Sequence, residues 1–399
     1  MSAPVLVVNA GSSSLKYSLV DAADGTAAAS GTVERIGEDS GVLTHRGPDG
    51  EHRSERRVAD HEDALRAALD AFAVHGPSLA DVDLRAVGHR VVHGGATFSA
   101  PALVDDALLE AVTRLMPLAP LHNGPNLEGL KVARRLFPDV PQVAVFDTAF
   151  HQTLPPRAFT YAVPHGWAEE HRIRRYGFHG TSFAFVSRAA AGLLGRPADD
   201  VNLVVLHLGN GCSATAVERG RSVDTSMGLT PLEGLVMGTR SGDVDPALHA
   251  HLHRELGWSL ADIDTALNKR SGLRGMTGEN DFRKVSQMRA AGDERAALAF
   301  DVYCYRIRKY VGAYYAVLGH VDAVVFTAGV GQHAPAVRSA ALSGLQRLGI
   351  EVDEERNQRA GDRPTVVSTD TSEVAVLVVP TDEEWEIARQ AVAVVESQS

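Results

Sequence analysis

The chain opens with a short hydrophobic run that is followed by a strictly alternating segment. Residues 5–8 are Val-Leu-Val-Val, and a short β-branched run of this kind predicts a buried strand. Residues 9–11, Asn-Ala-Gly, interrupt the run and predict a turn. Beyond the turn, Leu15, Tyr17 and Leu19 alternate with polar residues, which predicts a second strand with one apolar face. We therefore expect the chain to begin with a β-hairpin.

The polar face of this hairpin carries small hydroxyl side chains and one cation. Ser12, Ser14, Lys16 and Ser18 occupy the positions between the apolar ones. Small residues allow backbone amides to approach an anion closely, and a lysine adds a point charge for phosphate. A surface hairpin with a serine-rich turn is the alternative interpretation. We favour an anion-binding turn because Lys16 is the only lysine before Lys131.

The same order of elements returns half a chain later. Residues 201–217 contain an apolar run, a Gly-Asn-Gly turn, small hydroxyl residues and a second apolar run. Residues 324–331 form a further strand-and-turn segment, in which Gly329 and Gly331 permit close approach of the backbone to a nucleotide. The two hairpins predict two related α/β domains.

The rest of the chain alternates between amphipathic helix patterns and short apolar runs. Helices are predicted over residues 61–74, 105–116, 125–137, 181–194 and 293–318, with others beginning near 246 and 381. Strands are predicted over residues 31–58 (with a turn at 47–50), 82–92, 140–146 and 374–379. We expect a loop at residues 121–126 and a capping box formed by Thr381 and Glu384.

Composition narrows the classes of function. A hydrophobic fraction of 44% and a charged fraction of 22% are typical of a globular protein, and 399 residues predict two or three domains. The net charge of −11 argues against a nucleic-acid or anionic-membrane partner. Cys212 and Cys304 provide neither a disulfide framework nor a zinc site, which is typical of a cytoplasmic protein. The sequence shows no signal-peptide pattern and no apolar run long enough to span a bilayer.

Four charged residues stand at positions that favour catalysis. Arg90 and Arg240 lie in glycine-bracketed segments, Asp147 follows the apolar run at 140–146, and Glu383 lies at the start of the last helix. Phosphoryl transfer needs guanidinium groups, carboxylates that hold a metal ion, and backbone turns around the phosphates. The P-loop and the Gly-x-Gly-x-x-Gly fingerprint are missing from the sequence. A turn-forming Asp147 and a Glu383 that only faces the helix dipole are the structural alternatives.

Two segments closely resemble the signatures of the acetate kinases. Residues 9–16 read Asn-Ala-Gly-Ser-Ser-Ser-Leu-Lys, and residues 176–182 read Tyr-Gly-Phe-His-Gly-Thr-Ser. The likeness continues in order along nearly the whole chain, at residues 88–95, 120–123, 145–151, 207–211, 240–246, 281–283 and 380–384. Long matches in this order are far more specific than a single glycine motif.

This resemblance implies a fold, a reaction and an assembly. The implied fold is that of the actin-like, ribonuclease-H-like phosphotransferases: two α/β domains with mixed sheets flanked by helices, and an active site in the interdomain cleft. The N-terminal domain would comprise residues 1–149 and 383–399, and the C-terminal, nucleotide-binding domain residues 150–382. The implied reaction is reversible phosphoryl transfer from ATP to acetate, giving acetyl phosphate and ADP by direct in-line attack. Mg²⁺, with Mn²⁺ as an alternative, and a homodimer are implied as well.

The resemblance also assigns roles to individual residues. The implied catalytic residues are Arg90, Asp147, His179 and Arg240. The implied metal ligands are Asn9 and Glu383. The implied acetate pocket consists of Arg90, Val92, Leu121, Phe178 and Pro231. The implied contacts of ATP or ADP are Lys16, His207, Leu208, Gly209, Asn210, Gly211, Asp281, Phe282, Arg283, Gly329, Val330, Gly331, Gln332 and His333.

The chemistry of the acceptor limits what Asp147 has to do. A carboxylate has a pKa near ~4 and is already a nucleophile at neutral pH. It therefore needs orientation and charge neutralisation more than it needs a general base. We expect Asp147 to orient the acid or a metal-bound water, and Arg240 to act as an arginine finger within the chain.

Four residues at three places depart from the family pattern, and two other functions stay open. Gln332 and His333 stand where Glu-Asn is usual, Phe183 replaces a histidine, and Gly124 replaces a proline. A kinase for propionate or butyrate is the nearest alternative, because one methylene in an apolar pocket changes preference by only about 1–3 kcal/mol. An ATP-dependent sensor or chaperone on the same fold, without acyl transfer, is the alternative from a different class.

Overall fold

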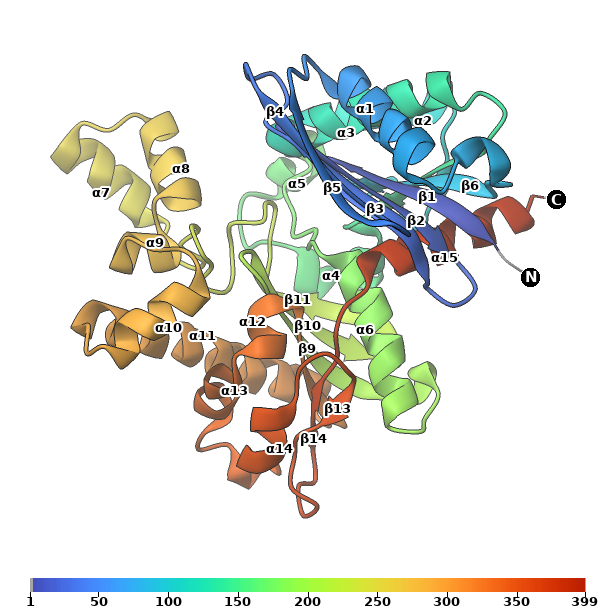
Figure 1. The fold of residues 1–399 in the computed structure, drawn as a ribbon. Helices are drawn as coiled ribbons and strands as arrows, with labels where there is room; N and C mark the ends of the chain where they lie inside the picture. Colours follow the sequence, from blue (N-terminus) through green and yellow to red (C-terminus); the bar gives the residue numbers. More distant parts are fainter. Residues whose placement is uncertain (1–2, 399) are drawn as a thin grey trace. The chain divides into compact units, whose positions relative to one another are not determined.

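The computed structural model of the protein describes residues 3–398, apart from the side chain of Leu121. These residues form two compact units. The first comprises the chain up to Gln152 together with the segment from Asp382 onward, and the second comprises Thr153–Thr381. Each unit is a mixed β-sheet flanked by helices (Figure 1).

The first unit is built on an eight-stranded sheet with the order β5-β4-β3-β2-β1-β6-β8-β7. Its strands are β1 (Pro4–Ala10), β2 (Ser14–Asp21), β3 (Ala27–Glu34), β4 (Gly41–Gly47), β5 (Gly50–Arg56), β6 (Ala86–Val91), β7 (Ala102–Leu103) and β8 (Gln142–Phe146). Its α-helices are α1 (His61–His75), α2 (Asp106–Leu115), α3 (Pro120–Leu136) and α15 (Glu383–Glu396). Strands β1 to β5 form an antiparallel meander, whereas β6 pairs in parallel with β1 and β8 in parallel with β6.

The opening hydrophobic run is buried on both faces of this sheet. Leu6 and Val8 belong to a core that β2, α1 and α3 complete. Val5 and Val7 point to the opposite face and pack in a core with Ile387 of α15. Because successive side chains of a strand point to opposite faces, a continuous apolar run of this kind requires helices on both sides.

The second unit is built on a six-stranded sheet with the order β11-β10-β9-β12-β14-β13. Its strands are β9 (Asn202–Leu208), β10 (Cys212–Glu218), β11 (Arg221–Thr225), β12 (Ala323–Thr327), β13 (Thr365–Val366) and β14 (Ala375–Val378). Its α-helices are α4 (Pro156–Phe159), α5 (His165–His171), α6 (Gly180–Leu193), α7 (Ala247–Leu256), α8 (Leu260–Lys269), α9 (Gly272–Thr277), α10 (Phe282–Ala290), α11 (Glu294–Leu318), α12 (Ala328–His333), α13 (Pro335–Leu342) and α14 (Glu354–Arg359).

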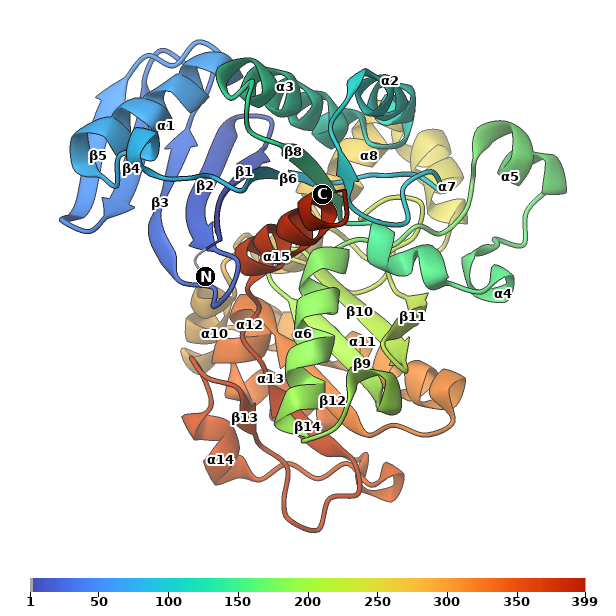
Figure 2. The same ribbon diagram turned by 90° about the vertical axis from the view of Figure 1, so that its right-hand side faces the viewer.

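Helices α6 and α11 cover opposite faces of this second sheet (Figure 2). His207 of β9 and Ser213 of β10 are cross-strand partners, and His207 contacts Ser182 of α6. Cys212, one residue earlier in β10, points to the other face and lies 3.3 Å from the hydroxyl of Tyr303 in α11. The alternation of a strand therefore separates a polar face at α6 from the face that packs on α11.

The two sheets share a five-strand core. In the first unit the order is β3-β2-β1-β6-β8, and in the second it is β11-β10-β9-β12-β14. In both cores, the first three strands pair with one another in antiparallel fashion. The fourth strand pairs in parallel with the central strand, and the fifth pairs in parallel with the fourth. The expectation of two related α/β units with mixed sheets is confirmed.

Most predicted elements are confirmed, including the long helix over residues 293–318. The turn predicted at Gly329 and Gly331 is wrong, because both lie in α12 directly after β12. The loop predicted at residues 121–126 is wrong as well. Helix α3 begins at Pro120 and contains Pro125 in its interior. A proline lacks the N–H that would bond to the carbonyl four residues earlier, so sequence patterns place a helix start at such a residue. Near the beginning of a helix the loss of this one bond is tolerated.

The predicted capping box at the last helix is also wrong. Asp382, and not Thr381, caps α15 by accepting a hydrogen bond from the Trp385 backbone N–H at 2.8 Å. The Thr381 hydroxyl lies 2.8 Å from Ser182 Oγ instead. Helix α15 therefore begins at Glu383, one residue past its cap, and Glu384 has no role in a capping box.

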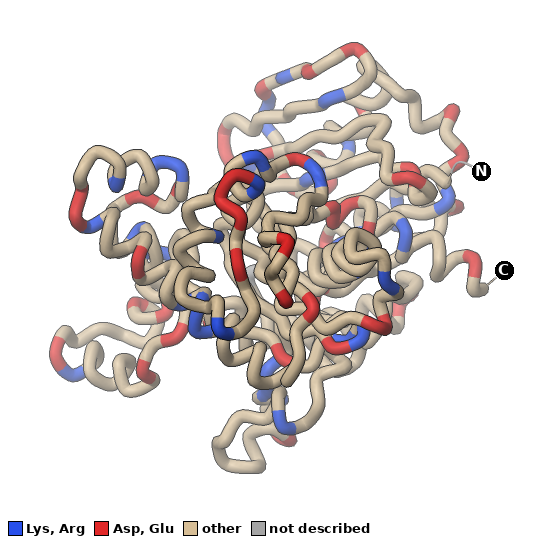
Figure 3. The backbone as a smooth tube through the Cα atoms, turned by 90° about the horizontal axis from the view of Figure 1, so that it is seen from below, with Lys and Arg blue, Asp and Glu red and all other residues tan. Residues whose placement is uncertain are grey.

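Neither the distribution of charged residues nor the hydrophobicity of the helices distinguishes one element from the others. Figure 3 shows basic and acidic positions interspersed along the backbone of each unit. Within residues 3–398, no helix combines the length and the apolar character needed to cross a membrane.

The lowered pKa of His89 makes the free energy of unfolding depend on pH. Burial lowers the pKa of this β6 side chain to about 4, and its hydrogen bond to Gln142 offsets only part of the effect. Between about pH 6.5 and pH 4 the unfolded chain binds a proton at this residue and the folded chain does not. The free energy of unfolding therefore falls as the pH is lowered through this range, by about 1.4 kcal/mol per pH unit from this group.

We expect His89→Asn to reduce the pH dependence of the urea unfolding midpoint between about pH 6.5 and pH 5. The slope with pH is the measurement, so a general loss of stability in the variant does not affect it. An unchanged slope would show that His89 does not titrate in this way.

Candidate functional site

Three polar residues stand at the carboxyl ends of neighbouring parallel strands in the first unit. Val8 of β1 pairs with His89 of β6, so that Asn9 and Arg90 follow at the same level. Asp147 directly follows β8, which pairs in parallel with β6. In open α/β sheets, ligands bind outside these strand ends. The register of three strands thus gathers an amide, a guanidinium and a carboxylate at one edge.

Arg90 and Asp147 form a bidentate ion pair. Arg90 Nη2 lies 2.7 Å from Asp147 Oδ2, and Arg90 Nε lies 3.1 Å from each carboxylate oxygen. Glu383 brings a second carboxylate, whose Oε2 lies 3.9 Å from Arg90 Nε. Among the residues that the structure describes, none accepts a hydrogen bond from Arg90 Nη1. This nitrogen is therefore available to a ligand.

Burial and opposite charge act against each other in this cluster. Burial by itself would lower the pKa of the Arg90 guanidinium, but the carboxylates of Asp147 and Glu383 raise it above its usual value. Burial raises the pKa of the Glu383 carboxyl, and the charge of Asp147 adds to this effect, although Arg90 opposes it. A cation next to Glu383 would stabilise its ionised form.

Asn9 and Glu383 carry the kind of oxygen donor that a divalent metal ion takes. The described part of the chain has no group of three or more His, Cys, Asp and Glu side chains arranged for a metal. Mg²⁺ commonly takes only one or two protein carboxylates and completes its shell with water and substrate phosphates. Asn9 pairs with Lys16 across β1 and β2, and Lys16 is close enough to lower the pKa of Glu383. The amide oxygen of Asn9 and the carboxylate of Glu383 are thus suitable donors.

Two buried asparagines of α3 hold the backbone around this cluster. Asn126 accepts a hydrogen bond from the Val92 N–H at 3.0 Å and donates to the Ala10 carbonyl at 2.7 Å. Asn123 accepts from the His93 N–H at 3.1 Å and donates to the carbonyl of the same residue at 2.9 Å. Sequence reasoning missed both because it placed them in a loop. Their spacing of three residues, which puts them on one helix face, was the available signal.

The residues expected around acetate are divided between the two units. Val92 follows β6 in the first unit and is half-buried. Phe178 is buried and Pro231 is half-buried, and both belong to the second unit. The side chain of Leu121 lies outside the described residues.

In the second unit, two histidines stack at the start of α6. The ring centroids of His179 and His207 are 4.2 Å apart with an interplanar angle of 20°. His179 Nδ1 lies 2.8 Å from Ser213 Oγ, and His207 Nδ1 lies 2.8 Å from Ser182 Oγ. His179 has a φ of 57°, a left-handed conformation that costs energy in a residue with a side chain. The stacking and the hydroxyl contact hold its imidazole in one orientation.

Arg240 lies next to His179 and lacks a carboxylate partner. A Cβ atom added at Gly211 would lie 3.5 Å from both Arg240 Nη1 and His179 Nε2. Nη1 donates to the Pro231 carbonyl at 3.2 Å, and Arg240 forms no ion pair with an acidic side chain of residues 3–398. Burial lowers the pKa of its guanidinium. A half-buried cation without a counter-ion, beside a histidine and a glycine backbone, is suited to bind an anion.

A cavity of about 590 Å³ adjoins the turn after β9. Eight of its lining residues belong to the implied nucleotide set: Gly209, Asn210, Asp281, Phe282, Arg283, Gly329, Val330 and His333. It is also lined by residues that sequence reasoning did not select: Gly238, Leu273, Asn280, Tyr303 and Ala334. The other six residues of the implied nucleotide set do not line the cavity. Lys16 lies in the first unit, and the remaining five lie in the second unit: His207, Leu208, Gly211, Gly331 and Gln332.

A buried arginine supports the wall of this cavity. Arg338 Nη1 donates to the carbonyls of Gly331 at 2.7 Å and Gln332 at 2.9 Å. Its Nε and Nη2 donate to the side-chain and backbone oxygens of Asn357 at 2.5 and 2.6 Å. Burial lowers the pKa of Arg338 to about 10. Sequence reasoning missed this residue, and its only signal was one arginine within an otherwise small and apolar helix.

Comparisons with known proteins cover both units. A sequence profile described as the acetokinase family matches residues 4–389. The acetate kinase of Streptomyces avermitilis is 58% identical over 395 residues, which are 98% of this chain and 97% of that protein. The crystal structure of Porphyromonas gingivalis acetate kinase superposes with a TM-score of 0.95 and 41% identity, covering 98% of this chain and 99% of that one. A propionate kinase from Francisella tularensis superposes with a TM-score of 0.92 and 40% identity, covering 97% and 98%.

Proposed function

Because the chain belongs to the acetokinase family, we propose that it transfers a phosphoryl group reversibly from ATP to acetate, forming acetyl phosphate and ADP. Membership of this family makes it a phosphotransferase of the kinase class that uses ATP or ADP and a divalent metal ion. The observation that carries the proposal is Arg240, a half-buried guanidinium beside His179 and the Gly211 backbone that forms no ion pair with a carboxylate of residues 3–398. An arrangement of this kind stabilises the charge that a migrating phosphoryl group spreads over its oxygens.

On the acid side, Arg90 binds the substrate carboxylate through Nη1. Asp147 occupies Nε and Nη2 of the same guanidinium, so it fixes the direction in which Nη1 points. Asp147 therefore acts as a positioning residue and does not need to accept a proton, because the acid is already ionised at neutral pH. Val92 contributes apolar surface for the methyl group.

The implied metal ion is Mg²⁺, held by Glu383 and Asn9. When bound, it supplies positive charge to the phosphate oxygens of the nucleotide. Lys16, which pairs with Asn9 across the hairpin, adds a further positive charge on the same strand pair. The raised pKa of Glu383 indicates a carboxylate whose ionised form gains from a neighbouring cation.

In the second unit, the cavity between Gly209 and His333 receives the nucleotide. Phe282 and Val330 offer apolar surface to the base, while Asn210 and Asn280 offer amide groups. Arg338 keeps the α12 backbone in place beneath this site. The carboxylate oxygen of acetate attacks the γ-phosphorus in line, the bond to the β,γ-bridging oxygen breaks, and ADP leaves. Arg240 and His179 stabilise the charge on the phosphoryl oxygens in this step.

The function is tested by incubating the purified protein with Mg-ATP, acetate and hydroxylamine, which traps an acyl phosphate as a hydroxamate. We expect hydroxamate formation that requires acetate and stops when the metal is chelated. A higher kcat/KM for propionate or butyrate than for acetate would favour the alternative kinase. Binding of ATP without any hydroxamate, for every acid of the series, would instead support a sensor or chaperone.

We expect Arg240→Ala to lower kcat by about two orders of magnitude or more, while the dissociation constant of ATP changes little. The reason is that Arg240 compensates charge that develops in the transition state. Calorimetric titration with ATP and steady-state kinetics measure the two effects. Turnover at the wild-type rate in this variant would remove Arg240 from the mechanism.

We further propose a homodimer, which accords with the exposed apolar residues of the α7–α8 segment. Leu256 at the end of α7 and Leu260 at the start of α8 are 55% and 73% exposed, and contiguous exposed apolar surface marks protein contacts. Sedimentation equilibrium is expected to show twice the chain mass of 42.5 kDa, and Leu260→Glu is expected to weaken the association. A single species of 42.5 kDa at micromolar concentration would contradict the dimer.

A further inference from the structure

The segment that carries Arg240 has no helix or strand of its own. It spans residues 226–246, between β11 and α7. Although it is irregular, Leu235, Val236 and Met237 within it are buried. A long irregular segment keeps one conformation only when other parts of the protein bind its backbone groups. Two clusters, built on the carboxylates of Glu233 and Asp243, do this at the two ends. Between them, the Gly238 and Ser241 N–H groups donate to the carbonyls of Asn210 and Leu267.

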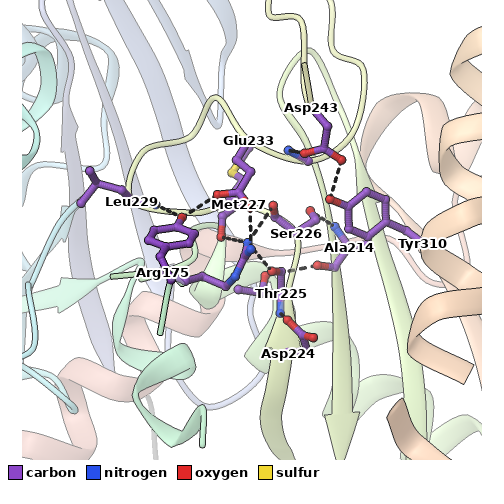
Figure 4. Close-up of polar contacts among 12 residues, drawn as sticks. Arg175, Ala214, Asp224, Thr225, Ser226, Met227, Leu229, Glu233, Asp243 and Tyr310 are labelled. Atoms are coloured by element: carbon purple, nitrogen blue, oxygen red, sulfur yellow. Dashed lines mark hydrogen bonds and ion pairs between the residues drawn. The ribbon is translucent and has the colours of Figure 1, made fainter. Parts of the chain in front are cut away.

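The first cluster holds the beginning of the segment (Figure 4). Arg175 Nη2 lies 2.5 Å from Glu233 Oε1, and its Nη1 donates to the carbonyls of residues 225–227 at 2.9, 3.1 and 3.2 Å. Tyr161 donates to Glu233 Oε2 at 2.5 Å and accepts a hydrogen bond from the Leu229 N–H at 2.9 Å. Burial and Glu233 both raise the pKa of Tyr161, so its hydroxyl stays a donor.

The second cluster consists of Gly234, Asp243, Arg306 and Tyr310, and we name this cluster the latch. Its hydrogen bonds between Gly234 and Asp243 close residues 234–243 into a ring. Asp243 Oδ1 accepts from the Gly234 N–H at 2.8 Å, and the Asp243 N–H donates to the Gly234 carbonyl at 3.0 Å. The Tyr310 hydroxyl donates to Asp243 Oδ2 at 2.8 Å. Arg306 Nη1 donates to the Gly234 carbonyl at 3.0 Å and lies 3.4 Å from Asp243 Oδ2.

Tyr310 and Arg306 stand one turn apart on α11, a 25-residue helix that packs on the sheet. The latch thus fastens a ring of irregular backbone to a rigid element. Arg240 lies inside this ring, and no carboxylate of residues 3–398 holds its guanidinium. Its Nη1 contacts the Pro231 carbonyl and its backbone carbonyl accepts from the Met237 N–H at 3.2 Å. The position of the guanidinium therefore depends on the position of the ring.

We propose that Tyr310, through Asp243, is a positioning residue that aligns Arg240 for phosphoryl transfer. This inference rests on the proposed function for its catalytic consequence, but not for the structural role of the latch. Misplacement of a catalytic group by about 1 Å can cost about 100-fold in rate, so a single hydroxyl in the latch is enough to affect turnover.

The first experiment compares Tyr310→Phe with Tyr305→Phe, an exposed tyrosine on the same helix. We expect Tyr310→Phe to lower kcat by about 10- to 100-fold with little change in the KM for ATP, and Tyr305→Phe to change neither. In an Arg240→Ala background the further effect of Tyr310→Phe is expected to be less than about twofold, because its only route to the reaction has been removed. Wild-type kcat in Tyr310→Phe, or the same loss with and without Arg240, would overturn the proposal.

The second experiment needs no enzymatic activity. We expect amide hydrogen exchange at Gly234 and Asp243 to be about tenfold faster in Tyr310→Phe than in Tyr305→Phe, with exchange in β9 and β10 unchanged. Unchanged exchange at Gly234 would show that Tyr310 does not hold the ring and would refute the latch. If the wild-type protein forms no acyl phosphate, the proposed function fails, whereas the exchange experiment still decides whether the latch exists.

Discussion

A central strand that is antiparallel to one neighbour and parallel to the other organises each unit. In the first unit this strand is β1, and in the second it is β9. An antiparallel neighbour needs only a short turn, whereas a parallel neighbour needs a crossover that covers a sheet face. The glycine-rich turn after the central strand consequently lies at the same edge as the carboxyl ends of the parallel strands. Asn9, Arg90 and Asp147 meet at that edge because of register.

Three arginines with little exposure to solvent, one buried and two half-buried, have different partners, and the partners indicate their roles. Arg90 is oriented by Asp147, with one nitrogen left for a ligand. Arg338 is surrounded by carbonyl and amide oxygens and supports backbone. Arg240 has a carbonyl and a thioether as neighbours, so its charge is poorly compensated. A charge that is largely removed from water is costly unless it is paired, and an anionic ligand would supply the counter-charge that the half-buried Arg240 lacks.

Local sequence patterns predicted helices and strands well where hydrophobic periodicity was the dominant feature of the segment. The helix at 61–74 and the strand run at 5–8 follow directly from periodicity, and both are confirmed. Predictions failed where tertiary contacts outweighed local preference. Asn123 and Asn126 bind the backbone of the ends of β6 and β1, which favours a helical α3 despite Pro125. Thr381 contacts Ser182, a residue 199 positions away, and the neighbouring Asp382 caps α15 instead.

The sequence by itself determined the α/β class, the repeated strand-and-turn design and the residue types required for phosphoryl transfer, because periodicity and turn chemistry are local properties. Only the tertiary structure decided how these residues are oriented. Arg90 and Asp147 are 57 positions apart, and Tyr310 and Asp243 are 67 apart. The register of parallel strands and the packing of α11 bring these pairs together, and no window of neighbouring residues contains that information.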